Sequence, residues 1–270
     1  MRTWHGACAV RMEAVYAATV PDFCALGPSP GIKAQLPPMT HFEFERMAPT
    51  PFGLGFVTHN GEWGADHYAH CYYDPDVPET YFTERMRLLS EEFGFSINKG
   101  EDVVEAILDY MLRRDFGPWW GEFLASAAES CGPAHDQQLA DAFASPLSQR
   151  VPDLTIEQAR SQLRSMASTY RWVILMYGQQ LATQDQEYIR RVLVDNMARN
   201  LGIDAFTADL VMARAEELCV DYRDELDAVA ASVRNEMQTT VYALPVCGFL
   251  PLTLTLGGVA CAILRKRGRL

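Results

Sequence analysis

The sequence contains little positive charge. Its 270 residues include 23 lysines and arginines against 35 aspartates and glutamates, which gives a formal net charge of −12. Four of the basic residues lie within the last six positions, so the remainder of the chain is more acidic still. Binding to nucleic acid depends on basic contacts to phosphate, and an acidic surface repels that backbone. We therefore expect no nucleic-acid partner.

Paired cysteines and several common motifs are also lacking. The seven cysteines are an odd number with no C-x-x-C pair, which favours reduced thiols over a disulfide framework. There is no phosphate-binding G-x-x-x-x-G-K-[ST], no dinucleotide-binding G-x-G-x-x-G and no zinc-binding H-E-x-x-H. A site built from distant residues leaves no such local pattern, so the question of enzymatic activity stays open.

Proline and glycine are concentrated in residues 1–75, especially between residues 21 and 60. Each proline fixes φ and removes a backbone donor, which opposes long helices. We therefore predict an irregular N-terminal region over residues 1–75, with extended chain and turns over 21–60. Pro146 is likewise expected to limit the helix that begins near residue 135.

Helical periodicity dominates residues 76–238. Apolar side chains recur every three or four positions over residues 156–177 and again over residues 211–237. Thr155 begins a capping box before the first of these stripes, and the second predicts one long helix that starts at Thr207. The sequence therefore predicts a mainly α fold in which residues 76–238 form an antiparallel helical bundle domain.

The longest apolar stretch lies near the C-terminus. A helix over residues 241–264 would be about 36 Å long at about 1.5 Å per residue, which exceeds a hydrocarbon core of about 30 Å. We therefore predict a single C-terminal transmembrane helix at residues 239–264, followed by a basic tail at residues 265–270. The residues expected to set its membrane depth and its helix contacts are Tyr242, Pro245, Gly257, Gly258, Arg265, Lys266 and Arg267.

Two other uses of this segment stay open. It could be a buried C-terminal helix, although a helix of this length in a globular domain normally has a polar face. The stretch LPVCG, with the apolar residues and RKRGR behind it, resembles bacterial cell-wall sorting signals in layout, with Cys247 where that motif has threonine.

The orientation in the membrane rests on two opposing arguments. The positive-inside rule places the basic tail in the cytoplasm. Arg11 and Glu13 interrupt the N-terminal apolar stretch, however, so no signal peptide is recognisable to export the body. We favour a single-pass membrane protein whose body faces the cytosol.

The densest group of metal-ligand side chains is THNGEWGADHYAHCYYDPD, at residues 58–76. Imidazole and carboxylate groups suit zinc or iron, and His67 and His70 are spaced to share one face of a turn. The candidate ligands of a divalent metal are His59, Glu62, His67 and His70. The alternative is a polar, aromatic loop that holds no ion.

Two functions follow from these patterns. The leading hypothesis is a membrane-anchored helical protein that acts as an interaction module or as an accessory subunit of a membrane complex. Its partners would be the lipid bilayer and another protein. The alternative is a metal-dependent enzyme of the membrane surface that uses the His- and Asp-rich loop at residues 59–76.

Overall fold

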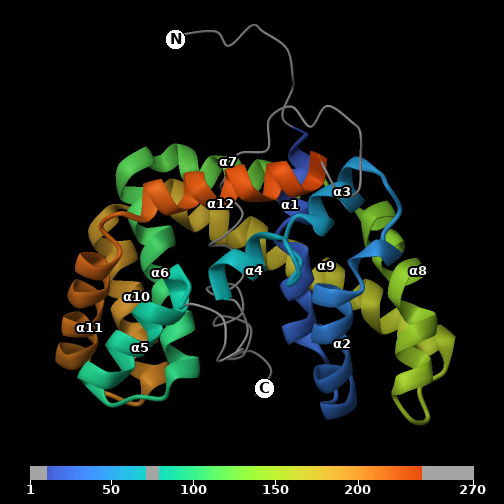
Figure 1. The fold of residues 1–270 in the computed structure, drawn as a ribbon, viewed down its shortest axis with the longest axis horizontal. Coiled ribbons are helices and arrows are strands. Elements are labelled where there is room, and N and C mark those ends of the chain that lie inside the picture. The colour runs from blue at the N-terminus through green and yellow to red at the C-terminus, as the bar shows by residue number, and fades with distance from the viewer. Residues whose placement is uncertain (1–10, 71–78, 239–270) are drawn as a thin grey trace, which may run out of the picture.

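The computed structural model describes residues 11–70 and 79–238, which are mainly helical and contain no strand (Figure 1). The first elements are short: α1 (Met12–Ala17), the 3₁₀ helix η1 (Val20–Leu26), α2 (Pro30–Phe42), the 3₁₀ helix η2 (Phe44–Arg46), α3 (Pro51–Val57) and α4 (Ala65–His70). The later helices are longer: α5 (Tyr81–Phe93), α6 (Ile97–Phe116), α7 (Pro118–Glu129), α8 (Pro133–Arg150), α9 (Ile156–Thr183), α10 (Gln186–Leu201), α11 (Ala205–Leu218) and α12 (Tyr222–Glu236). The predictions of a mainly α fold and of a helical bundle are confirmed.

Two hydrophobic clusters fill the interior. The N-terminal core is formed by α1, η1, α2, α3, α8 and the first part of α9, around buried rings such as Phe23, Phe56 and Tyr170. The C-terminal core is formed by α5, α6, α10, α11 and α12, around side chains such as Ile107. In Figure 1 helices α5, α6, α10 and α11 lie on the left and α2, α3 and α8 on the right, while α12 runs across the top toward α1. Because the N-terminal core draws helices from both sides of residue 75, the predicted domain boundary does not separate the cores.

Helices α7 and α9 join the two cores, since both contribute side chains to each cluster. Glycines meet where these helices cross. A β-carbon at Gly178 of α9 would lie 2.6 Å from the backbone nitrogen of Ala125 and 2.9 Å from the carbonyl oxygen of Gly121. Both contacts are with the backbone of α7, so only a residue without a β-carbon allows this approach.

The expectation of irregular structure over residues 1–75 is wrong for the part of that region that the structure describes. Pro30 and Pro51 occupy the first positions of α2 and α3, where the missing N–H would have no partner within the helix. Ser29 and Thr50 precede them, and their hydroxyl groups accept hydrogen bonds from backbone N–H groups of the first turn. The prolines therefore begin helices here.

Helix α8 continues to Arg150, past Pro146, where the sequence suggested a limit. The missing N–H of Pro146 leaves the carbonyl of Ala142 without its helical donor. Ala142 is only half-buried, so water can satisfy that oxygen. The cost of the proline is therefore small enough for the helix to tolerate.

The stripe over residues 211–237 is divided between two helices, which corrects the prediction of one long helix. The break is held by Arg85 of α5, whose Nε donates a hydrogen bond to the carbonyl oxygen of Leu218 at 2.8 Å. Its Nη2 donates to the carboxylate of Asp221 at 2.9 Å. The guanidinium thus provides a hydrogen-bond donor for a carbonyl group at the C-terminal end of α11, and its positive charge suits that end of the helix. Tyr222 then resumes the buried stripe in α12.

None of the helices within residues 11–70 and 79–238 is long and apolar enough to cross a membrane. The predicted transmembrane segment at residues 239–264 and the basic tail at 265–270 lie outside the described residues. The same applies to Tyr242, Pro245, Gly257, Gly258, Arg265, Lys266 and Arg267. The anchor stays a prediction from the sequence.

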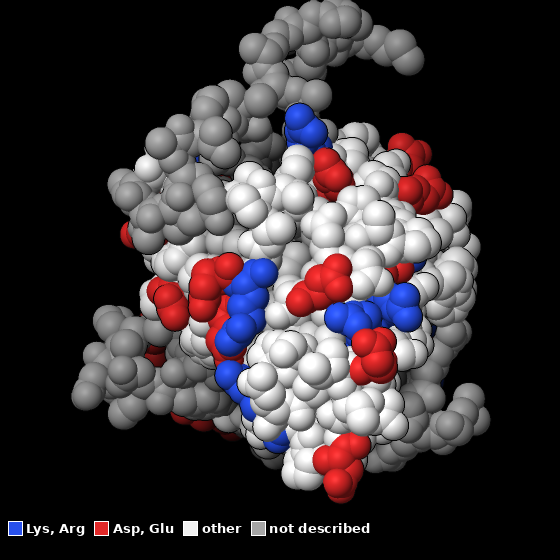
Figure 2. All heavy atoms as spheres, turned by 90° about the vertical axis from the view of Figure 1, so that its right-hand side faces the viewer, with Lys and Arg blue, Asp and Glu red and all other residues white. Residues whose placement is uncertain are grey.

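The side of the molecule that carries α8 shows small, mixed groups of acidic and basic side chains between uncharged areas (Figure 2). Ion pairs of α8 and its neighbours include Arg150 with Glu43 at 2.5 Å and Arg160 with Glu157 at 2.6 Å. Exposed pairs of this kind contribute about 0–1 kcal/mol each, so the buried cores dominate the stability of the fold.

Candidate metal centre

Three side chains from separate parts of the N-terminal core converge. Asp22 lies in η1, His41 in the last turn of α2 and His59 just after α3, and one ligand atom of each lies within 4.8 Å of the others. The carboxylate of Asp22 lies between the rings, with one oxygen 3.5 Å from Nε2 of His41 and the other 3.7 Å from Nε2 of His59. Asp66 of α4 adds a second carboxylate, 4.0 Å from the same nitrogen of His59.

Both imidazole rings are held by backbone carbonyl groups. Nδ1 of His59 lies 2.9 Å from the carbonyl oxygen of Ala18, and Nδ1 of His41 lies 2.8 Å from that of Pro37. A carbonyl oxygen only accepts hydrogen bonds, so each Nδ1 carries the hydrogen. In the neutral ring, Nε2 then presents its lone pair toward the carboxylates, as in histidine ligands oriented by an outer hydrogen bond. Nε2 of His59 makes no hydrogen bond with any residue that the structure describes.

The chain over residues 58–67 folds back on itself and places His59 beside Asp66. The backbone N–H of Asp66 donates to the carbonyl oxygen of His59 at 3.0 Å. Asn60 is fully buried, and its side-chain oxygen accepts hydrogen bonds from two backbone N–H groups that follow it, at 2.8 and 2.9 Å. A β-carbon at Gly64 would lie 2.4 Å from the backbone nitrogen of Asn60, so the turn requires glycine there.

The group is largely removed from water. The side chains of His41, His59 and Asp66 are 10%, 9% and 6% exposed, and that of Asp22 is 19% exposed. Burial by itself lowers the pKa of His41, but a hydrogen bond to Asp22 and the charges of Asp66 and Asp22 raise this pKa to about 9. Two carboxylates in so small a buried space require positive charge nearby. A proton on His41 supplies one charge, and a divalent cation would supply two.

The distances suit a transition-metal ion. Zinc binds imidazole nitrogen and carboxylate oxygen at about 2.0–2.2 Å, which puts tetrahedral ligands about 3.4 Å apart. Each Nε2 lies near that distance from a different oxygen of Asp22, at 3.5 Å for His41 and 3.7 Å for His59. Imidazole also suits iron, and carboxylate also suits manganese. Asp22, His41 and His59 therefore fit the ligand set of a single metal ion.

Of the four ligands predicted from the sequence, the structure places His59 in this group. Glu62 is exposed, and His67 is half-buried with its ring edge-on to Tyr68 at a centroid distance of 5.1 Å. His70 ends α4, and its side chain lies outside the described part of the structure. The loop therefore contributes His59 and the nearby Asp66 to the group, whereas Asp22 and His41 lie elsewhere in the chain.

Sequence reasoning missed Asp22 and His41, and it did not select Asp66. Asp22 and His41 lie outside the loop at residues 59–76, and no ligand spacing connects them with it. The sequence offered one signal for His41. The chain has only six histidines, and His41 is the nearest one that precedes the loop. Convergence of segments so far apart in the chain becomes visible only in the fold.

Residues 27–31, GPSPG, have the G-x-S-x-G spacing of hydrolase nucleophiles. That motif places serine on a sharp turn between a strand and a helix. Here the segment follows the 3₁₀ helix η1, and Ser29 caps α2 by accepting a hydrogen bond from the backbone N–H of Ile32 at 3.4 Å. We therefore assign Ser29 to helix capping.

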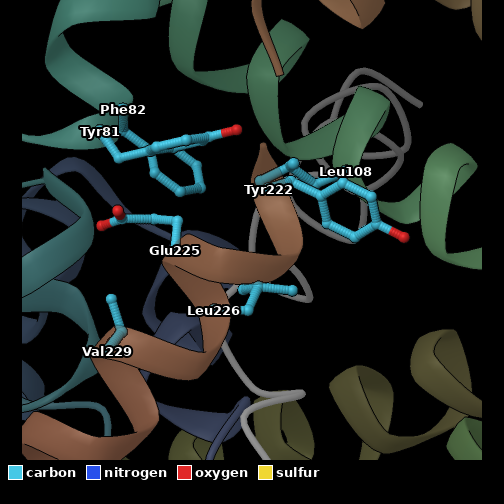
Figure 3. A pocket seen from close by; sticks show the side chains of 7 residues that line it. All are labelled: Tyr81, Phe82, Leu108, Tyr222, Glu225, Leu226 and Val229. Atoms are coloured by element: carbon cyan, nitrogen blue, oxygen red, sulfur yellow. The ribbon is translucent and has the colours of Figure 1, made fainter. Parts of the chain in front are cut away.

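A shallow pocket in the C-terminal core is a second place where a ligand could bind. The residues that line it, from α5, α6 and α12, are Tyr81, Phe82, Leu108, Tyr222, Glu225, Leu226 and Val229 (Figure 3). Its enclosed volume is only about 10 Å³, which is room for about one water molecule. Small-molecule sites commonly have about 300–1,000 Å³, so this pocket is the weaker candidate.

Comparison of the chain with protein-family models, with curated proteins and with solved structures gives no match. Function must therefore be inferred from the chemistry of the molecule itself. The convergence of Asp22, His41 and His59 is the feature of the described residues with the clearest chemical use.

Proposed function

We propose that the protein binds a divalent transition-metal ion through Nε2 of His41, Nε2 of His59 and the carboxylate of Asp22. The observation that carries the proposal is the convergence of Nε2 of two buried histidines on the half-buried carboxylate of Asp22, with each Nδ1 held by a backbone carbonyl group. Three protein ligands leave a coordination position for water or substrate, as catalytic zinc sites do. The proposal therefore favours a metal-dependent enzyme over a purely structural module.

Metal content after reconstitution tests this proposal. The purified chain is stripped with a chelator, loaded separately with Zn²⁺, Mn²⁺ or anaerobic Fe²⁺, and freed of unbound metal before elemental analysis. We expect one ion per chain for at least one of these metals. His41→Ala and His59→Ala should each abolish stoichiometric binding, because either change removes one of three ligands.

Two control variants separate ligation from unfolding. His135 of α8 is another partly buried histidine, paired with Glu13 at 3.2 Å outside the centre. His135→Ala should retain the metal, and so should His67→Ala, which removes a ligand predicted from the sequence alone. Circular dichroism of every variant checks that the helices are intact. Wild-type protein that binds none of the three metals would contradict the proposal.

A second proposal concerns membrane attachment, and the sequence of residues 239–264 supports it. This uncharged, apolar run would anchor the chain in a bilayer, where the body would contact another protein or a membrane-complex subunit. Carbonate extraction of membranes from cells that express the full chain provides the test. The full chain should stay in the membrane pellet, and a chain ending at residue 238 should appear in the supernatant. Release of the full chain would refute the anchor.

A further inference from the structure

Asp66 belongs to the same group of side chains as the three proposed ligands, and its carboxylate lies 4.0 Å from Nε2 of His59. Resting on the proposed metal binding, we infer that Asp66 is not a ligand but the hydrogen-bond acceptor for the molecule at the coordination position that the three ligands leave open. The centre would then take a water-sized molecule that can donate a hydrogen bond, such as water or a small alcohol, and would exclude anions.

The distances separate Asp66 from the ligand set. Only Asp22, His41 and His59, among the described residues, form a group whose ligand atoms all lie within 4.8 Å of one another. The carboxylate of Asp66 lies 4.0 Å from Nε2 of His59, farther than the 3.5 and 3.7 Å that separate Asp22 from the two histidines. The hydrogen bond from the backbone N–H of Asp66 to the carbonyl oxygen of His59 holds the residue at this position.

A water molecule bound to the ion would lie about 2.1 Å from it, and the inference places this water on the side of Asp66. A carboxylate is an acceptor with two oxygens, so it can receive a hydrogen bond from that water. Hydrogen bonds to an ionised acceptor are the stronger kind, and outer-shell groups of this type orient the ligands of metal sites. Asp66 therefore complements a donor at the open position.

Burial limits the size of that donor. Asp22 is the most exposed member of the group, at 19%, whereas Asp66 is 6% exposed. We therefore expect approach from the side of Asp22, and the burial of the other three side chains favours a molecule of a few atoms. Charge limits its kind, because an anion at the open position would face the carboxylate of Asp66 in a medium of low dielectric constant.

The probe for this inference is azide, a small anion that changes the visible absorption of cobalt when it binds. The protein is reconstituted with Co²⁺, and azide is titrated into the wild type, Asp66→Asn and Glu62→Gln. Glu62 is the matched control, because it lies in the same turn but is exposed. We expect Asp66→Asn to keep one ion per chain and to bind azide at least about tenfold more tightly, since it removes the repelling charge. Glu62→Gln should resemble the wild type.

Each other result has a distinct meaning. Wild-type protein without bound Co²⁺ would count against the proposed metal centre itself. If the wild type holds Co²⁺ but Asp66→Asn loses it, Asp66 is a ligand, and the inference is overturned while the metal centre stands. Equal azide affinity in the wild type and Asp66→Asn would also overturn the inference, because Asp66 would then not face the open position.

Discussion

Replacing Gly178 by alanine should destabilise the protein, although alanine is the better helix former. The new β-carbon would lie 2.6 Å from the backbone nitrogen of Ala125 and 2.9 Å from the carbonyl oxygen of Gly121. Ordinary contact begins at 3.4 Å, so α7 and α9 must separate by about 0.8 Å, enough to lose about a quarter to a half of each affected dispersion contact. No rotamer change relieves the clash, because both neighbours are backbone atoms.

The magnitude follows from two opposing effects. Alanine contributes about 1 kcal/mol of helix propensity over glycine. Forcing a methyl group into a packed contact typically costs about 1–3 kcal/mol, and the upper end applies here because buried residues such as Trp120 and Tyr177 lie next to the crossing. We expect a net loss of about 2 kcal/mol in the free energy of unfolding for Gly178→Ala.

Urea denaturation followed by circular dichroism measures this loss. Gly31→Ala in α2 is the control, since its β-carbon would meet only side-chain atoms of Val151, the nearest at 3.1 Å. That variant should stay within about 1 kcal/mol of the wild type, in either direction. If Gly178→Ala proves as stable as the wild type, the close approach of α7 and α9 is not a feature of the folded protein.

Other consequences can be checked in the same way. Burial and neighbouring acidic charges raise the pKa of Glu105 well above its usual value, so Glu105 destabilises the folded protein increasingly as pH rises above about 4.5. Glu105→Gln should therefore melt at a higher temperature than the wild type at pH 7, and this gain should disappear near pH 4. A difference in melting temperature that does not change with pH would contradict this. Arg113 donates hydrogen bonds to the carbonyl oxygens of Leu181 and Gln184. Arg113→Met should therefore lower the free energy of unfolding, measured by urea titration, by about 2–3 kcal/mol. A loss below about 0.5 kcal/mol would show that water replaces the guanidinium as the donor. A bound metal stabilises the folded state, so a chelator should lower the melting temperature of the metal-loaded wild type. The same treatment should leave the melting temperature of Asp22→Asn unchanged. An equal fall in both proteins would show that the metal binds elsewhere.

The C-terminal helices were the predictable part of the fold. Thr155 forms the capping box that the sequence indicated, and Gly202 adopts a left-handed conformation with φ of 73° after α10. The N-terminal half was not predictable by the same reasoning, because proline was counted as a helix breaker. Pro30 and Pro51 stand at first helical positions, where the residue favours a helix. Whether proline favours or opposes a helix depends on its position in the helix, and the proline content of a segment does not show that position.

The proposed metal centre was less predictable than the fold. The sequence emphasised residues 59–76 because their ligand side chains are close together in the chain. A buried centre instead selects ligands by convergence, and Asp22 and His41 reach His59 only because η1, α2 and α3 pack in one core. The density of ligand side chains in the sequence selected only His59 of the three proposed ligands, since it carries no information about packing between segments.

Arginine and histidine side chains both donate hydrogen bonds to backbone carbonyl groups in this fold, and the two residue types differ in their capacity to bind a metal. In the C-terminal core, Arg85 donates to the carbonyl of Leu218, and Arg113 caps the end of α9. In the N-terminal core, the carbonyl of Ala18 at the end of α1 receives its hydrogen bond from His59. Arginine stays charged and offers no lone pair, whereas histidine donates through one nitrogen and keeps the other for a ligand bond. The short N-terminal helices, with their many ends, therefore create positions at which a histidine both satisfies the backbone and remains able to bind a metal.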